Sequence, residues 1–211
     1  SAFNWFLKAA EQGNIGAQYN IGMMFLEGKG CDINEERAIY WIRNAADKGL
    51  VEAQLNLSTF YFTGKYVDKN TKLALRLLHS AAESNYPAAC ARLAYIYYAG
   101  IEVKSDSEQA FKYIQKAAES GIPEALFILG SMYIEGRGVT ANPKKGRKII
   151  YGAAKKGCYK AQLYIGFIFL ARRENDISTQ WFELALKNAA GLKLFISDEE
   201  TGVTYLKHNP S

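Results

Sequence analysis

The chain is poor in cysteine and histidine, and it has no long apolar run. Its three cysteines, Cys31, Cys90 and Cys158, are scattered. An odd, irregularly spaced set argues against a disulfide framework, and no two of them have the spacing of metal ligands. No stretch approaches the roughly 20 apolar residues that a membrane-spanning helix needs. Hydrophobic residues make up 49% and charged residues 22%, which is ordinary for a well-packed protein. We expect no metal and no cofactor.

What the chain does have is an internal repeat of 36 residues. An Ala-Ala pair returns at this interval, at Ala9-Ala10, Ala45-Ala46, Ala81-Ala82, Ala117-Ala118 and Ala153-Ala154. A single alanine keeps the same interval, at Ala17, Ala53, Ala89, Ala125 and Ala161. A fixed period of this size is typical of a solenoid, in which each repeat packs on its neighbours. We therefore expect an all-α, right-handed α/α superhelical solenoid of antiparallel helix pairs.

The first complete repeat shows how a pair is built. Apolar residues at helical spacing predict a first helix over about 15–27, which Gly28-Lys29-Gly30 ends because glycine adopts the left-handed conformation. A second helix should run from after Asn34 to Gly49. N-capping residues recur at Asn34, Asn70, Asp106 and Asn142. Small residues of the second helix recur at Ala2, Ala38, Ala74, Ala110 and Gly146, beside the larger Trp5, Trp41, Leu77, Tyr113 and Ile149. Small against large at fixed positions predicts closely packed helices.

The repeat becomes irregular toward the C-terminus. Trp181 aligns with Trp41 only when four residues are deleted from the loop after Phe169. The predicted solenoid covers residues 1–188, with a partial repeat at 1–13 and repeats at about 14–49, 50–85, 86–121, 122–157 and 158–188. Residues 189–211 should form a degenerate capping segment, since an end repeat must cover an exposed core. Within it, Ser197 and Glu200 fit a capping box, which predicts a short helix reaching about Lys207.

The segments 17–25, 28–30, 38–41 and 45–49 together resemble the Sel1-like repeat, a family of α/α solenoids related in architecture to tetratricopeptide repeats. Segments 117–121, 125–138 and 161–166 resemble it as well. Asn85 departs from the family pattern at the glycine that closes a second helix. Tyr66 and Glu102 depart from it at the second loop glycine.

The resemblance implies a scaffold for protein or peptide contacts. Such scaffolds are often found in bacterial exported or host-facing proteins and in some signalling or quality-control assemblies. The sequence leaves the compartment open; for a bacterial protein, a periplasmic or secreted setting would be favoured over a cytoplasmic one. Family members with regular cysteine pairs form a subgroup that this chain does not fit. Because Ser1 starts inside a helical pattern, no signal peptide is expected within the given sequence, and we expect this sequence to be a piece of a longer protein.

Three positions of the first helix vary freely between repeats and, at spacing i, i+3 and i+7, form one stripe. The first two positions hold Asn20, Asn56, Arg92, Ile128 and Tyr164, then Met23, Thr59, Tyr95, Ser131 and Phe167. The third position holds Glu27, Thr63, Ala99, Glu135 and Ala171. In a curved solenoid the first helices would line the concave side, so the stripe is a candidate groove for an extended or helical peptide. Alternatively, these positions are only solvated or adjust packing.

Charge is distributed unevenly along the chain. Ten basic residues and no acidic residue lie between residues 137 and 173: Arg137, Lys144, Lys145, Arg147, Lys148, Lys155, Lys156, Lys160, Arg172 and Arg173. Such a segment would steer an acidic protein, an anionic lipid headgroup or a nucleic acid toward it. Nucleic acid is disfavoured, because the basic residues do not alternate with exposed aromatic residues in any known motif. A solvated helix face is the other interpretation.

Few residues are suited to catalysis. His79 lies in a helical pattern and His208 near the end of the chain, so structural or exposed roles are simpler. Glu27 and Glu135 are three repeats apart. Because neighbouring helices are about 8–10 Å apart, the separation of these two carboxylates exceeds the roughly 5–9.5 Å of a glycosidase pair. The Gly28-Lys29-Gly30 and Gly136-Arg137-Gly138 segments follow helices and lack P-loop spacing, which favours turns.

The sequence thus predicts a monomeric, non-enzymatic scaffold that binds a protein or peptide partner on its concave face. Two alternatives stay open. The protein would bind an anionic or cell-envelope ligand through the basic C-terminal half, or it would be a hydrolase or another enzyme or enzyme subunit.

Overall fold

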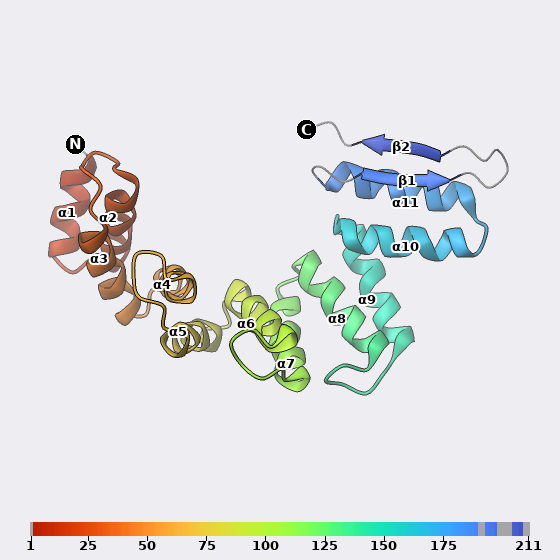
Figure 1. Ribbon diagram of the computed structural model, residues 1–211, viewed down its shortest axis with the longest axis horizontal. Helices are drawn as coiled ribbons and strands as arrows, with labels where there is room; N and C mark the ends of the chain where they lie inside the picture. The colour runs from red at the N-terminus through yellow and green to blue at the C-terminus, as the bar shows by residue number, and fades with distance from the viewer. Residues whose placement is uncertain (1, 190–192, 198–203, 209–211) are drawn as a thin grey trace. The chain divides into compact units, whose positions relative to one another are not determined.

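The computed structural model describes residues 2–189, 193–197 and 204–208. These residues form eleven α-helices and two β-strands (Figure 1). The helices are α1 (Ala2–Glu11), α2 (Ile15–Glu27), α3 (Glu35–Asp47), α4 (Val51–Thr63), α5 (Thr71–Glu83), α6 (Pro87–Ala99), α7 (Ser107–Glu119), α8 (Pro123–Glu135), α9 (Pro143–Lys155), α10 (Tyr159–Ala171) and α11 (Asn175–Asn188). The strands are β1 (Lys193–Ser197) and β2 (Thr204–His208). The chain divides into two compact units, Ser1–Ser105 and Asp106–Ser211.

The helices alternate between two roles. The even-numbered helices α2 to α10 are the first helices of the repeats, and the odd-numbered helices α1 to α11 are the second helices. The first helix expected over 15–27 and the second helix expected after Asn34 are confirmed as α2 and α3. The expected all-α repeat of helix pairs is therefore confirmed, with the two C-terminal strands as its exception.

The predicted N-caps are confirmed at all four positions. The side chains of Asn34, Asn70, Asp106 and Asn142 each accept a hydrogen bond from the backbone N–H three residues further on. This bond satisfies one of the amides that a helix leaves unpaired at its start, which fixes where each second helix begins.

Positive φ angles recur where the repeat turns, even where glycine is missing. Gly28 ends α2 with φ 67°, and the loop residues Tyr66 and Glu102 adopt φ 67° and 59° in place of the second glycine. Asn85, which replaces the closing glycine after α5, has φ 55°. The backbone of the repeat therefore overrides the steric preference of these side chains.

The two helices of a pair pack antiparallel through small residues. A Cβ atom added to Gly22 of α2 would lie 2.6 Å from the Ile42 side chain and 2.9 Å from the carbonyl oxygen of Ala38 on α3. In the second unit, Gly130 of α8 and Gly146 of α9 lie so close that a Cβ atom on Gly146 would be 2.5 Å from the Gly130 carbonyl oxygen. Small residues at these positions let the backbones approach, as the sequence predicts.

Glutamine side chains tie one repeat to the next. Gln18 Nε2 donates to the carbonyl oxygen of Ala10 at 3.1 Å, and Gln54 Nε2 donates to that of Ala46 at 3.2 Å. Gln162 Nε2 makes the corresponding bond to Ala154 at 3.0 Å in the second unit. These glutamines are buried, so each bond satisfies a helix-terminal carbonyl that water cannot reach.

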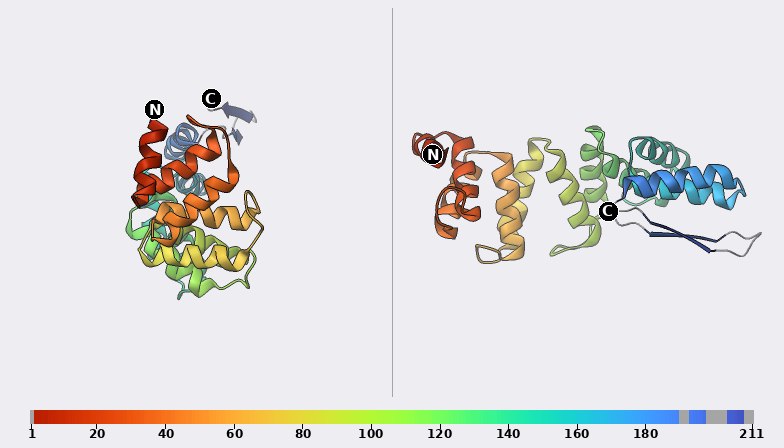
Figure 2. Two further views of the ribbon diagram at one scale, coloured as in Figure 1. Left: turned by 90° about the vertical axis from the view of Figure 1, so that its left-hand side faces the viewer. Right: turned by 90° about the horizontal axis from the view of Figure 1, so that it is seen from above.

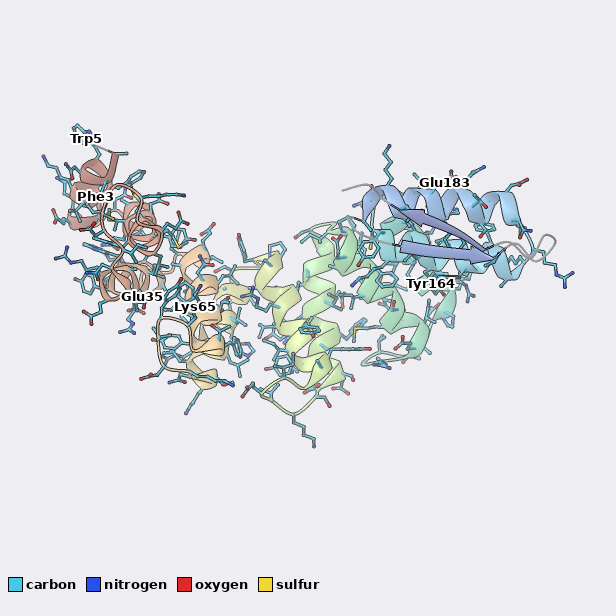
Figure 3. All side chains as sticks on the ribbon, turned by 45° about the horizontal axis from the view of Figure 1, so that its top comes forward. Phe3, Trp5, Glu35, Lys65, Tyr164 and Glu183 are labelled. Carbon is cyan, nitrogen blue, oxygen red and sulfur yellow. The ribbon has the colours of Figure 1, made fainter. Side chains whose placement is uncertain are left out.

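The small-and-large pattern holds in the second helices except at the start of the chain. Ala38, Ala74 and Ala110 are buried, but Ala2 is exposed. Trp5 is 76% exposed and points away from α1 (Figure 3), whereas Leu77 at the same repeat position is 9% exposed.

The C-terminal end differs from the expected helix. The loop between α10 and α11 spans residues 172–174, four residues fewer than the loop at 28–34, which confirms the predicted deletion. The helix predicted from Ser197 to about Lys207 is wrong, because β1 and β2 form an antiparallel pair in which Leu194 faces Lys207. Phe195, Ile196, Thr204 and Tyr205 have high strand propensity, which the capping-box prediction ignored. Glu200 lies outside the described residues.

The strand β1 contacts α11. The helices α10 and α11 lie side by side in both Figure 1 and Figure 2. The second unit therefore ends in a helix pair followed by a hairpin.

Candidate functional site

The candidate site is the first-helix face, the stripe formed by the two variable positions of α2, α4, α6, α8 and α10. In the first unit it consists of Asn20, Met23, Asn56, Thr59, Arg92 and Tyr95. In the second unit it consists of Ile128, Ser131, Tyr164 and Phe167. All ten residues are exposed or half-buried, and none is in a buried core. The two parts of this face thus belong to two different compact units.

In the first unit, polar side chains of successive first helices bond to one another. Asn56 Nδ2 on α4 donates to the hydroxyl of Tyr19 on α2 at 2.6 Å and lies 3.8 Å from the Met23 sulfur. Arg92 on α6 donates from its guanidinium to Thr59 Oγ1 on α4. The structure thus brings the two variable positions of adjacent repeats together, a relation that the i, i+3 spacing within one helix did not reveal.

Tyr19 is a member of this network that the sequence analysis missed. Burial, with Glu52 and Glu27 as further causes, raises the pKa of its hydroxyl, which stays protonated and can act as donor or acceptor. Its repeat position holds Leu55 and Phe127 in other repeats, so the column looks apolar and only the fold shows the hydroxyl at the face.

In the second unit, the face is apolar. Phe167 is 56% exposed and Ile128 is 41% exposed, while Tyr164 is half-buried. The Phe167 ring packs edge-on against Phe182 of α11, with centroids 5.1 Å apart. Ser131 donates its hydroxyl to the Phe127 carbonyl oxygen of its own helix at 3.0 Å, so it presents little polarity to the surface.

Leu170 extends this apolar area and was also missed. It lies one turn beyond Phe167 on α10 and is exposed. Its repeat position holds Leu26, Phe62 and Ile134 elsewhere, which made it look like a core position. Lys160 is the sole charged residue of α10. A helix that is apolar on all sides is normally covered, yet α10 leaves Phe167 and Leu170 at the surface of the described chain.

The two glutamates of the third variable position have structural partners. Glu27 pairs with Lys29 at 2.5 Å, and Glu135 pairs with Arg137 at 2.7 Å, both at the ends of first helices. The glycine-flanked segments that contain these basic residues are left-handed turns, with φ between 67° and 76° at their glycines.

His79 and the cysteines occupy structural positions. The His79 imidazole lies 3.1 Å from the Tyr97 hydroxyl, and burial lowers the pKa of this histidine. Cys90 and Cys158 are buried, Cys31 is half-buried, and all three are free thiols. Burial raises the pKa of Cys158, which disfavours its reactive thiolate. The described residues contain no cluster of three or more side chains suited to a metal ion.

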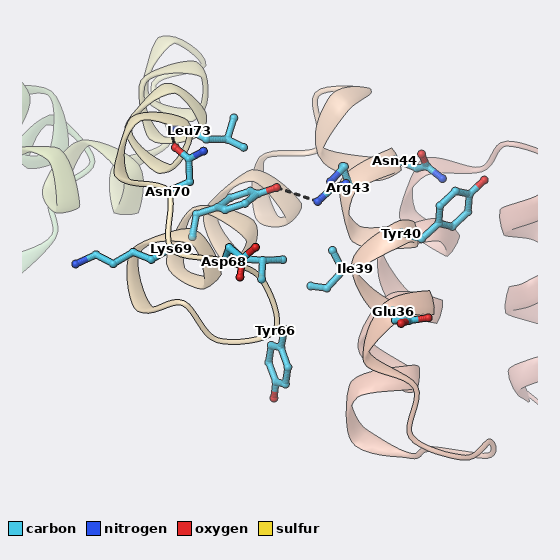
Figure 4. A pocket seen from close by; sticks show the side chains of 12 residues that line it. Glu36, Ile39, Tyr40, Arg43, Asn44, Tyr66, Asp68, Lys69, Asn70 and Leu73 are labelled. Atoms are coloured by element: carbon cyan, nitrogen blue, oxygen red, sulfur yellow. Dashed lines mark hydrogen bonds between the residues drawn. The ribbon is translucent and has the colours of Figure 1, made fainter.

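An open cleft in the first unit was not foreseen from the sequence (Figure 4). It lies between α3 and the loop that connects α4 to α5, and its lining is Glu36, Ile39, Tyr40, Arg43, Asn44, Tyr61, Tyr66, Val67, Asp68, Lys69, Asn70 and Leu73. Arg43 Nη2 donates to the Tyr61 hydroxyl at 2.9 Å across it. The cleft depends on how one loop stands against a neighbouring helix, so no sequence motif marks it.

The basic segment is centred on α9. Lys144, Arg147 and Lys148 are exposed and form no hydrogen bond or ion pair through their side chains within the described part of the chain. Lys145 donates to the Tyr133 hydroxyl at 2.7 Å, and Lys156 donates to the Gly121 carbonyl oxygen at 3.3 Å. Lys155 and Lys160 lie over tyrosine rings, and Arg172 and Arg173 follow α10.

No helix within the described residues has the length and apolar character needed to cross a bilayer.

The Sel1 repeat family matches five consecutive segments of the chain, residues 1–14, 15–50, 51–86, 87–122 and 123–158. The chain belongs to the Sel1-like repeat family. Each complete matched segment holds one first helix and one second helix. The pair α10–α11, with its shortened loop, follows the last matched segment.

Solved structures agree with this assignment. A protective antigen present in uropathogenic Escherichia coli strains, which displays an SLR fold, is 29% identical with a TM-score of 0.79. The match covers 87% of this chain and 40% of the antigen, so this chain spans less than half of that protein. A Sel1 repeat protein from Oxalobacter formigenes is 30% identical with a TM-score of 0.77, and the match covers 84% of this chain and 75% of that one. No curated protein matches the chain.

More distant structures share the fold alone. An immunity protein from Pseudomonas aeruginosa is 18% identical with a TM-score of 0.51, over 88% of this chain and 74% of that one. Sel1-like repeat proteins are typically non-catalytic repeat scaffolds and generally act as protein-interaction modules.

Proposed function

We propose that this protein is a non-catalytic scaffold that binds a peptide segment of a partner protein on its first-helix face. The proposal combines the general role of Sel1-like repeat scaffolds with the composition of this face. The apolar area of the second unit, formed by Ile128, Tyr164, Phe167 and Leu170, is the main contact.

The observation that carries the proposal is the exposure of Phe167 and Leu170 on α10. Large apolar side chains gathered at one surface mark interaction sites more often than isolated ones do. Fully burying such a side chain contributes about 1.5–3 kcal/mol, so covering the exposed half of Phe167 would contribute about 1 kcal/mol. A few such residues together supply the centre of an interface.

The polar part of the face in the first unit offers hydrogen-bonding groups of its own. Asn20 and Arg92 are exposed, and Asn56 is already held by Tyr19, so its remaining hydrogen-bonding groups are fixed in place. A pre-positioned amide hydrogen-bonds an extended or helical peptide with little loss of side-chain entropy.

The test is a selection of displayed random peptides on the wild-type protein, followed by affinity measurements with the selected peptides. We expect Phe167→Ala and Ile128→Ala each to weaken binding about five- to tenfold, which corresponds to about 1–1.4 kcal/mol. Tyr40→Ala is the matched control, because Tyr40 is an equally exposed aromatic residue of a second helix.

Equal binding to all three variants, or the selection of no peptide, would count against the first-helix face. Thermal unfolding of each variant shows whether the fold is intact. Because Ile128→Ala leaves the Phe167–Phe182 packing unchanged, weaker binding by this variant does not result from a loss of that packing.

A further inference from the structure

The outer faces of the second helices carry a four-residue stripe that can be compared between repeats. Its positions are i, i+4, i+7 and i+11, which lie on one side of a helix. The stripe holds Glu36, Tyr40, Arg43 and Asp47 on α3, then Lys72, Arg76, His79 and Glu83 on α5, then Glu108, Lys112, Gln115 and Glu119 on α7, and Lys144, Lys148, Tyr151 and Lys155 on α9. Within the described chain, α9 has the only one of these four stripes without a carboxylate.

The stripe of α9 is open to solvent, and α9 itself contains no acidic residue. Lys144, Lys148 and Lys155 are exposed, and Arg147 extends the positive charge along one edge. The second helices α3, α5 and α7 place an acid at the position of Lys155, which would neutralise a neighbouring lysine there. On α9 the Lys155 ammonium instead lies 4.7 Å from the centre of the Tyr151 ring.

An apolar strip of α11 adjoins this basic stripe. The Trp181 ring packs against the Tyr151 ring, with centroids 5.8 Å apart, and so joins α11 to α9. Ile177 and Leu184 lie four residues before and three residues after Trp181, on the same side of α11, and both are exposed. Basic and apolar groups thus form one surface, which we name the α9–α11 face.

We propose that the α9–α11 face binds an acidic amphipathic peptide segment of a partner protein, as a second surface distinct from the first-helix face. Carboxylates of the peptide pair with Lys144, Lys148 and Lys155. Its apolar side chains cover Tyr151, Trp181 and Leu184. Charge complementarity speeds the encounter and fixes the orientation, while the apolar contact slows dissociation.

The acids of α11 favour a peptide over a membrane surface. Asp176, Glu183 and Lys187 lie on the edge of the exposed side of α11 that is remote from Trp181, so this edge carries two carboxylates against one ammonium. A planar anionic bilayer laid across both helices would meet these carboxylates together with the lysines. A narrow peptide that follows α9 and Trp181 avoids them.

The probe is a fluorescein-labelled peptide of about 14 residues with glutamate and leucine at helical spacing, a helix of about 21 Å. Binding is measured by fluorescence anisotropy at low and moderate salt. The Lys144→Glu/Lys148→Glu variant should bind at least about tenfold more weakly, because two attractions become repulsions.

The fold offers a matched control for this variant. Lys72→Glu/Arg76→Glu makes the same change of charge at the same two repeat positions of α5 and should stay within about twofold of the wild type, since no apolar strip adjoins a fully basic stripe there. Leu184→Ser should weaken binding about threefold without altering charge. Amide shifts on adding the peptide should concentrate in α9 and α11.

Several results would overturn the proposal. Equal weakening by the two double variants would mean that the peptide responds to net charge alone. No effect of Leu184→Ser would remove the apolar contact. Binding to phosphatidylserine vesicles or to a single-stranded oligonucleotide in place of the peptide would assign the face to another ligand class. If the double variant does not fold, the exposed single change Lys155→Glu replaces it: weaker binding supports the proposal, and unchanged binding contradicts it.

Discussion

At the scale of single residues, the repeat imposes the same backbone on side chains that suit it unequally. Glycine ends most of the first helices in the left-handed conformation, but α10 is followed by Arg173 with φ 61°. A side chain with a Cβ atom is strained there, whereas glycine is not. Replacing such a residue by glycine is therefore expected to raise the free energy of unfolding.

Arg173→Gly should therefore stabilise the protein by about 0.5–1 kcal/mol, since relief of the left-handed strain outweighs the added freedom of the unfolded chain. Arg172→Gly is the matched control, because Arg172 is its exposed neighbour, has φ −91° and loses the same charge. It should destabilise by up to about 1 kcal/mol. Chemical unfolding measures the free energy of unfolding of both variants. A similar change in the two would show that the lost charge, and not the φ angle, determines the effect.

The lowered pKa of His79 links stability to pH. Because burial disfavours its charged form, the unfolded chain takes up a proton near the ordinary pKa of about 6.5 while the folded chain does so at lower pH. Stability should therefore fall as the pH decreases below about 6.5, until the folded histidine is protonated as well.

His79→Gln removes this contribution while keeping a hydrogen-bonding group near Tyr97. The loss of stability between neutral and mildly acidic pH should be smaller in the variant than in the wild type, by urea unfolding at both pH values. The carboxylates common to both proteins cancel in this comparison. Parallel pH dependence in the two proteins would contradict a role for His79.

At the scale of elements, each loop between a first and a second helix has to fit the preceding repeat. The loop after α8 approaches the start of α7 so closely that a Cβ atom on Gly138, at φ 69°, would overlap the Ser107 carbonyl oxygen. The equivalent residues Tyr66 and Glu102 carry side chains, so this contact is specific to one loop. Identical repeat positions therefore differ in what they tolerate.

Gly138→Ala should destabilise the protein by about 2–4 kcal/mol, since neither the φ angle nor the space accommodates a methyl group. Gly152→Ala should have the opposite sign, a gain of up to about 1 kcal/mol, because Gly152 is inside α9 with nothing near the new methyl group. Thermal and chemical unfolding give both values. A tolerated Gly138→Ala would mean that the loop moves away from α7.

At the scale of the whole molecule, a solenoid is held by contacts between neighbouring elements, so its stability is a sum along the chain. The chain accordingly divides into two compact units, and α10 and α11 contact their sequence neighbours. A substitution that disrupts one repeat should therefore destabilise mainly that repeat and its neighbours.

Gly166→Ala tests this expectation, since its Cβ atom would lie 2.6 Å from the buried Phe182 ring. Amide hydrogen exchange should accelerate in α10 and α11, while the amides of α2 to α4 keep their protection. Gly16→Ala, whose methyl group meets only an ordinary contact, is the control. Uniform acceleration along the chain would show that the molecule unfolds as one cooperative body.

Much of the fold followed from local chemistry. The caps at Asn34 and Asn142, the helix bounds and the four-residue deletion before α11 are encoded within one or two turns of chain, so a single sequence reveals them. The C-terminal helix was mispredicted because a short capping signal competed with strand propensity and with pairing between β1 and β2. Pairing partners lie outside the reach of a local motif.

The sequence by itself determined the period, the helix pairs and the membership of the variable stripe, because these depend on spacing along the chain. Only the tertiary structure decided how that stripe is used, with Asn56 held by Tyr19 and Phe167 left at the surface. It also decided that Tyr151 of α9 meets Trp181 of α11. The Asn56–Tyr19 and Tyr151–Trp181 contacts join residues more than twenty positions apart, and their geometry depends on how closely successive helices pack.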